Sequence, residues 1–114
     1  MTPETISATE CERRMSALLG KGGITTGFPR KRRDLWIVLH AIAQRFAPDE
    51  RLSEIEATRR IGGFLLESGG SWEMDRATLR RALVDEGFLD RDADGRNYRR
   101  SERYREQVKF GKTE

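Results

Sequence analysis

A hairpin signal directly after a helical segment constrains this chain more than any other feature. Asp94-Gly95 is a dipeptide typical of tight β-turns, and it lies between Phe88–Arg91 and Arg96–Arg100, two short segments of strand-like pattern. The preceding segment, Asp75–Glu86, begins with a good N-cap residue, has apolar residues at helical spacing and is followed by Gly87. The sequence therefore predicts a helix that leads straight into a two-stranded hairpin.

Two further helices are expected before that unit. Arg32–Phe46 follows a proline suited to a first helical turn and is apolar nearly all round, which predicts a central helix. Ser53 and Glu56 have the spacing of a capping box and predict a helix that extends to about Glu67. Between the two helices, Arg51-Leu52 could form a very short strand.

The resulting order indicates a mainly α (α+β) fold of the winged helix-turn-helix type. It has three core helices plus a C-terminal two-stranded β-hairpin, preceded by an extra N-terminal helix at Ser7–Leu19, which packs on the domain or on a partner. We expect an N-terminal helix and Gly-rich connector over 1–27, a winged-helix-like domain over 28–100 and a basic tail over 101–114. After about Glu106 the tail has only two apolar residues, so we expect it to be flexible.

Composition narrows the class of function. The 114 residues suffice for about one domain, and no segment approaches the roughly 18 to 20 apolar residues of a membrane span. The N-terminus is unlike a signal peptide, so we expect no membrane partner and a cytoplasmic location. Cys11 and His40 are the single residues of their types, too few for a protein-only zinc site, and no phosphate-binding loop is present. We therefore expect no cofactor, no metal, no catalytic residues and no enzymatic activity.

Basic residues are concentrated in two places. Between Arg96 and Lys112 there are seven basic residues against two acidic ones, and Arg30–Arg33 contains four adjacent cations. In a winged helix the third helix enters the major groove and the hairpin contacts the flanking backbone. The candidate nucleic-acid-binding residues are Arg30, Lys31, Arg32, Arg33, Arg76, Thr78, Arg80, Arg81, Arg91, Arg96, Arg99 and Arg100.

Each basic cluster has a structural alternative. The arginines of the third helix could pair with Asp75, Asp85 or Glu86, and those of the hairpin could form a solvated edge that prevents aggregation. The Arg30–Arg33 cluster opposes the dipole of its own helix, which indicates either an external anion or acidic partners within the fold. Among the aromatic residues, we expect Trp36 and Phe46 in the core. Tyr98 could fill the space under the hairpin, and Trp72 could cap the core or contact a partner.

The motifs also carry a resemblance. The chain resembles a bacterial domain family catalogued as domain of unknown function 2087, over about Phe28 to Arg100. The residues that carry it are Phe28-Pro29-Arg30-Lys31-Arg32-Arg33-Asp34, the run from Ala77 to Arg91, Asp94-Gly95 and Tyr98. That family occurs alone or attached to ArsR-like regulators, and the resemblance implies a regulatory or DNA-binding module.

The sequence thus favours a module of a bacterial transcription regulator that binds duplex DNA. The expected contact face consists of Arg76, Arg80, Arg81, Arg91, Arg96 and Arg99. The alternative is a protein interaction or homodimerisation module without DNA contact, with its interface on the Arg32–Phe46 helix or on the Ser7–Leu19 helix.

Overall fold

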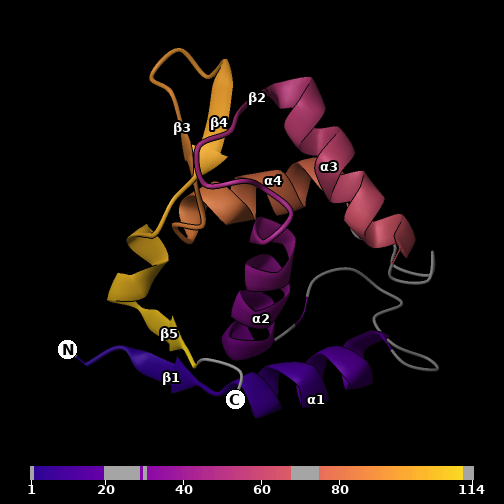
Figure 1. Cartoon of the computed structure of the whole chain (residues 1–114), viewed down its shortest axis with the longest axis vertical. Helices are drawn as coiled ribbons and strands as arrows, with labels where there is room; N and C mark the ends of the chain where they lie inside the picture. Colours follow the sequence, from indigo (N-terminus) through magenta and orange to yellow (C-terminus); the bar gives the residue numbers. More distant parts are fainter. Residues whose placement is uncertain (1, 20–28, 30, 68–74, 112–114) are drawn as a thin grey trace.

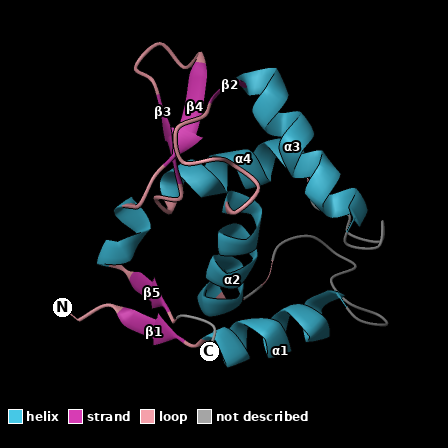
Figure 2. Cartoon of the chain, in the orientation of Figure 1, coloured by secondary structure: helices cyan, strands magenta, loops and turns pink. Residues whose placement is uncertain are grey.

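We analysed a computed structural model of the chain, in which residues 2–19, 29, 31–67 and 75–111 are described. These residues form four α-helices, two small sheets and one 3-10 helix, so the fold is mixed α+β (Figures 1 and 2). The elements in chain order are β1 (Glu4–Ile6), α1 (Ala8–Leu19), α2 (Arg32–Ala43), β2 (Arg51–Ser53), α3 (Glu54–Glu67), α4 (Arg76–Asp85), β3 (Leu89–Arg91), β4 (Asn97–Arg100), η1 (Arg103–Glu106) and β5 (Val108–Phe110).

Helix α2 is the centre of the molecule. Its apolar side chains from Trp36 to Leu39, together with Ile42, are 4% exposed or less. Figure 1 shows α1 across one end of α2 and α4 across the other, and both helices contact it. The expectation of a central helix is confirmed, and so is the core position of Trp36 and Phe46. The helix ends at Ala43, three residues before the predicted end, because the N–H groups of Arg45 and Phe46 bond to carbonyls three residues back.

Local capping signals at three helix starts and one helix end are confirmed. The Ser7 hydroxyl accepts a hydrogen bond from the Glu10 N–H at 3.0 Å, and the Ser53 hydroxyl accepts one from the Glu56 N–H at 3.2 Å. The Asp75 carboxylate accepts from the Thr78 N–H at 2.8 Å, and Gly87 has the positive φ of +86° expected after the last turn of α4. These contacts satisfy backbone groups that a helix terminus otherwise leaves unpaired.

The predicted hairpin is present, and it belongs to a larger sheet than expected. Strands β3 and β4 pair antiparallel around a turn in which Gly95 has φ of +73°. Strand β2 pairs with the other edge of β4, which gives a three-stranded sheet in the order β2-β4-β3 instead of a two-stranded hairpin. The short strand anticipated at Arg51-Leu52 is the third member, because Leu52 opposite Tyr98 buries both side chains on the face toward the helices. We call this the hairpin sheet.

The two outer segments of the chain form a second sheet that the sequence did not predict. Strand β1 pairs with β5 in parallel, with Glu4 opposite Val108 and Ile6 opposite Phe110. We call this the terminal sheet. We expected a flexible segment after about Glu106, but residues 108–110 form a strand. Val108 is fully buried, in one core with Ile6 and with α2. Pairing with a distant strand supplies the backbone partners and the apolar cover that the segment lacks by itself.

The N-terminal helix packs on the domain, which is one of the two expectations for it. Cys11, Met15 and Leu18 lie against the core from α1. Tyr98 is buried under the hairpin, as the sequence suggested. Trp72 and Arg30 fall outside the described residues. None of the helices in the described part of the chain is long and apolar enough to cross a membrane.

Candidate nucleic-acid interface

Helix α4 presents a charged face away from the core. Leu79 and Leu83 are fully buried, whereas Arg81 lies two positions from each of them, on the opposite side of the helix, and is exposed. The guanidinium of Arg81 has no hydrogen-bond or ion-pair partner among the described residues. Hydrogen bonds from Thr78 lower the pKa of Asp75 at the start of α4, and the charge of Arg81 contributes, but no hydrogen bond or ion pair among the described residues keeps Arg81 from an external anion.

A cavity of about 170 Å³ lies between α4 and the hairpin. We call it the α4–hairpin cavity. Arg91 and Tyr98 are register partners, so their side chains point to the same face of the hairpin sheet, toward α4. Arg91 is exposed and, like Arg81, has no ion-pair partner in the described part of the chain. The residues that line the α4–hairpin cavity are Arg80, Arg81, Val84, Asp85, Arg91 and Tyr98. Three arginines and one acidic residue thus line this cavity.

Arg80, although adjacent to Arg81, is used inside the fold. Its guanidinium donates to the Thr58 hydroxyl at 2.8 Å and pairs with the Glu54 carboxylate at 3.1 Å, both on α3. Its side chain is only 13% exposed and lies over the Tyr98 ring at 5.7 Å. The Tyr98 hydroxyl in turn donates to Glu54 at 3.4 Å. Arg80 therefore fastens α4 to α3 and to the hairpin, with a different acidic partner from the three that the sequence suggested.

The first turn of α4 is also turned inward. The guanidinium of Arg76 lies against Gly62 of α3, where a Cβ would come within 2.7 Å of Cζ, so a glycine inside α3 leaves room for it. The Thr78 hydroxyl donates to the Asp75 carboxylate at 2.7 Å. This bond, with that from the Thr78 N–H, lowers the pKa of Asp75. Arg76 is exposed but directed toward α3, and Thr78 is occupied in the helix cap.

The hairpin arginines separate onto two faces and a tip. Arg96 is at the tip, with its side chain 83% exposed and its Nε 3.8 Å from the Asp94 carboxylate. Arg99 is exposed and follows the buried Tyr98, so it lies on the face of the sheet that points away from α4. There it is paired in register with Arg51, a residue that the sequence analysis did not single out. The six-arginine face is thus not continuous, because Arg99 points away from it.

Arg100, the last hairpin candidate, is held at the end of α2. Its guanidinium donates to the Phe46 carbonyl at 3.3 Å and to the Gln44 side-chain oxygen at 3.1 Å. Both acceptors lie in the segment that follows α2, so Arg100 connects the end of β4 to that segment. Arg100 lines none of the α4–hairpin cavity.

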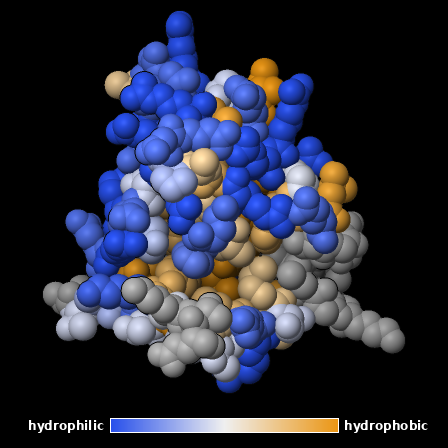
Figure 3. Space-filling model, in the orientation of Figure 1, coloured by the Kyte–Doolittle hydropathy of each residue, from blue (hydrophilic) through white to orange (hydrophobic). Residues whose placement is uncertain are grey.

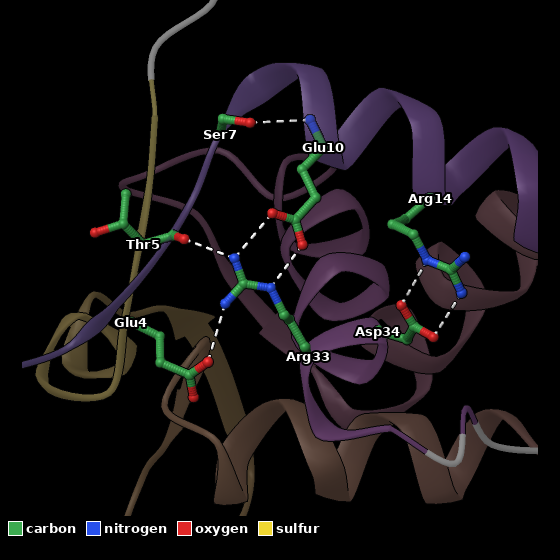
Figure 4. A network of polar contacts seen from close by, with 7 residues as sticks. All are labelled: Glu4, Thr5, Ser7, Glu10, Arg14, Arg33 and Asp34. Carbon is green, nitrogen blue, oxygen red and sulfur yellow. Dashed lines mark hydrogen bonds and ion pairs between the residues drawn. The ribbon is translucent and has the colours of Figure 1, made fainter.

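Arg33, in the basic cluster at the start of α2, is paired with acidic residues of the fold. Arg33 donates to the Glu10 carboxylate at 2.6 and 2.8 Å, to Glu4 at 2.9 Å and to the Thr5 carbonyl at 2.7 Å. In Figure 4 it reaches from α2 to both α1 and β1, beside a second pair in which Arg14 donates twice to Asp34. The hydrogen bond from Arg33 lowers the pKa of Glu10. Internal acidic partners, one of the two explanations left open, therefore account for this cation.

Arg32 is likewise used within the fold. It donates to Glu86 at 2.9 Å and to the Gln107 side-chain oxygen at 2.8 Å, and it lies over the Trp36 ring. The Trp36 indole N–H donates to the same Glu86 oxygen at 2.8 Å. Glu86 is thus an acidic partner within the fold, as one of the two explanations for this cluster required. Lys31 is exposed and has no ion-pair partner among the described residues.

The described residues offer no three-residue metal site and no His or Cys side chain that is charged near neutral pH. They contain no group of three or more His, Cys, Asp and Glu side chains placed to hold a metal ion. Burial lowers the pKa of His40 to about 4, with a contribution from Arg100, and burial raises the pKa of the Cys11 thiol. Both groups are therefore uncharged near neutral pH.

Comparison with known proteins identifies the family and no more. No curated protein and no solved structure matches the chain. The model of one family, described as an uncharacterized protein conserved in bacteria (DUF2087), matches residues 25–100. This range contains α2, β2, α3, α4 and the hairpin, and leaves the terminal sheet, α1 and η1 outside. The resemblance carried by the sequence motifs is confirmed, and this chain belongs to the DUF2087 family.

Proposed function

We propose that this protein is a winged helix-turn-helix module of a bacterial, cytoplasmic transcription regulator, which binds duplex DNA without catalysing a reaction. The order α2-β2-α3-α4-β3-β4 and the strand order β2-β4-β3 support the proposal, because they correspond to a helix-turn-helix followed by a hairpin that flanks it. In this arrangement α4 is the recognition helix and the turn at 92–96 is the tip of the wing.

The observation that carries the proposal is the pair of free arginines at the α4–hairpin cavity. Arg81 comes from the recognition helix and Arg91 from the hairpin, and both lack an internal ion-pair partner in the described residues. Arg80, which is next to Arg81 in the sequence, is instead paired with the Glu54 carboxylate of α3. Two unpaired arginines from different elements thus lie at one surface. Their positive charge is what binding of a phosphate backbone requires.

Separate roles follow for the residues of this surface. Arg81, on the outer face of α4, is placed to reach a guanine edge or a phosphate as α4 lies in the major groove. Arg91 and Arg96 contact the flanking phosphates from the hairpin. Arg80 is a positioning residue, since its ion pair with Glu54 sets the angle between α4 and α3. Figure 3 shows hydrophilic side chains over the region of the hairpin, in contrast to the hydrophobic, hollowed area lower in the same view.

The alternative, a protein interaction module, has weaker support. The apolar residues of α2 are buried by other elements of the same chain, and α1 uses Cys11, Met15 and Leu18 to pack on the core. The apolar residues of α2, and in part those of α1, are thus occupied by contacts within the chain, which favours the DNA-binding proposal over this alternative. Exposed large apolar residues within the described part of the chain are confined to Ile55 and Leu66, at the two ends of α3.

A salt titration with matched variants tests the proposal. Duplex binding by the unmodified protein should weaken steeply with salt, and Arg81→Ala with Arg91→Ala should flatten the slope of log affinity against log salt by about two units. Arg51→Ala with Arg99→Ala removes the same charge from the opposite face of the hairpin sheet and should leave the slope nearly unchanged. An absence of duplex binding at low salt, or equal effects of the two double variants, would contradict the proposal.

A further inference from the structure

A second, larger cavity lies beyond the end of β4. Its volume is about 390 Å³, and it is formed by the C-terminal part of α2, the end of β4, η1 and β5. We call it the C-terminal cavity. It shares no lining residue with the α4–hairpin cavity, although β4 supplies Tyr98 to one and Arg100 to the other. The two cavities are therefore separate sites.

The C-terminal cavity has a strong excess of positive charge. Arg100, Arg105 and Lys109 line it, and none of its described lining residues is acidic. Arg105 pairs with Glu102 at 3.0 Å, but both side chains are more than half exposed, so solvent weakens this pair. Lys109 is exposed and has no ion-pair partner in the described residues. At least one ammonium group at the cavity is thus free to bind an external anion.

One wall of the same cavity is aromatic and uncharged. The ring of Phe110 is stacked on that of His40, with centroids 3.8 Å apart and an interplanar angle of 16°. Tyr104 stands edge-on to Phe110 at 5.9 Å and is itself fixed by stacking on the buried Phe88. Such a wall accepts a flat ring by stacking or edge contacts.

We propose that the C-terminal cavity binds a small aromatic anion, a ring that bears a carboxylate or phosphate group. The ring packs against the wall formed by Phe110, His40 and Tyr104, and the anionic group pairs with Lys109 and Arg105. Arg100, held in place by Gln44 and the Phe46 carbonyl, adds a fixed positive field without moving. The cavity volume lies within the range of about 300 to 1,000 Å³ that is typical of small-molecule sites.

His40 provides a direct readout, because it is the single histidine of the sequence and its ring forms part of the wall. Its ring proton signals can be followed by NMR while the intact protein is titrated with phenyl phosphate. Parallel titrations with inorganic phosphate and with phenol separate the charge from the ring. We expect a saturable shift with phenyl phosphate, at a concentration at least about tenfold lower than with either of the other two. No saturable shift, or equal affinity for all three compounds, would overturn the proposal.

A second experiment reverses the charge of one residue that lines the C-terminal cavity. Lys109→Glu should weaken phenyl phosphate binding by about tenfold, because an attractive charge at the cavity becomes repulsive. Lys31→Glu is the matched control: Lys31 is also exposed and unpaired, but it precedes α2 and does not line this cavity. The backbone amide spectrum reports whether each variant is folded. If both lysine variants bind phenyl phosphate as the unmodified protein does, the proposed contact is wrong.

Discussion

The two small sheets of this protein contribute similarly to the core but are assembled in opposite ways. In the hairpin sheet, β3 and β4 are close in the sequence and pair around a turn that the sequence predicts at Asp94-Gly95. The terminal sheet joins Glu4–Ile6 to Val108–Phe110, from opposite ends of the sequence. Yet Ile6 and Val108 are buried as completely as Leu89 of the hairpin sheet. Distance along the chain therefore does not decide how much a strand contributes to the core.

The segment that the family model matches is also smaller than the segment that forms the hydrophobic core. The family model matches residues 25–100, which include the hairpin sheet and exclude both strands of the terminal sheet. Ile6, Tyr104 and Val108 nevertheless belong to the same buried cluster as α2. In this chain, the matched segment is covered on one side by residues outside it. The comparison predicts that damage to the terminal sheet destabilises the whole domain.

The largest expected effect is that of a charge in the terminal sheet. Val108→Asp should lower the free energy of unfolding by more than about 3 kcal/mol, because a carboxylate would be placed where no side-chain area is exposed. Urea denaturation measures the change. Leu89→Asp, in the hairpin sheet, should have an effect of similar size.

The neighbouring Lys109 provides the control, since it is exposed in the same strand. Lys109→Asp should change the free energy of unfolding by less than about 1 kcal/mol. If Val108→Asp were as harmless as this control while Leu89→Asp unfolded the protein, the terminal sheet would be an accessory and the comparison would fail.

A smaller effect is expected from the contact that fastens the terminal sheet to α2. Arg33→Ala should lower the free energy of unfolding by about 1 to 2 kcal/mol, because Glu10, Glu4 and the Thr5 carbonyl lose a shared donor that is about one-third exposed. Duplex DNA binding should stay unchanged once the protein is folded. The matched control is Arg81→Ala, for which the opposite pattern is expected: unchanged stability and weakened binding.

A further effect, which depends on pH, concerns the contact between α2 and β5. The pKa of His40 is lowered from 6.5 to about 4, so the unfolded chain takes up this proton at a higher pH than the folded one. The associated stability is complete above pH 6.5 and is lost as the pH falls toward about 4. Urea denaturation at a series of pH values should show this decline. His40→Gln should remove it within that window, and an unchanged pH dependence in the variant would assign the decline to other groups.

Much of the fold was predictable because its signals are local. A capping box, an Asp-Gly turn and a glycine after a helix each require only a few adjacent residues, and all were placed correctly. The terminal sheet was not predictable on these terms. Three residues such as Glu4–Ile6 have no periodicity, and only a partner at the other end of the chain makes them a strand.

The candidate site was predictable in composition but not in arrangement. Arg80 and Arg81 are equivalent in the sequence, but only the position of Glu54 on a neighbouring helix decides that Arg80 is bound and Arg81 is free. Because neighbouring residues of a strand point to opposite faces, the burial of Tyr98 could have predicted that Arg99 points away from α4. The cross-strand partner Arg51 could not be recognised until the register of β2 was known.

The parallel pairing of β1 and β5 has a mechanical consequence. When force is applied to the two ends of the chain, it enters at the start of β1 and leaves at the end of β5, so the strands are pulled past each other lengthwise. The hydrogen bonds from the Glu4 N–H to the Gln107 carbonyl and from the Gly111 N–H to the Ile6 carbonyl then share the load and must break together. In an antiparallel hairpin that is pulled apart at its free ends, the hydrogen bonds between the strands would instead break one after another. β1 and β5 thus form a shear clamp, which protects the helices and the hairpin from tension until its hydrogen bonds break.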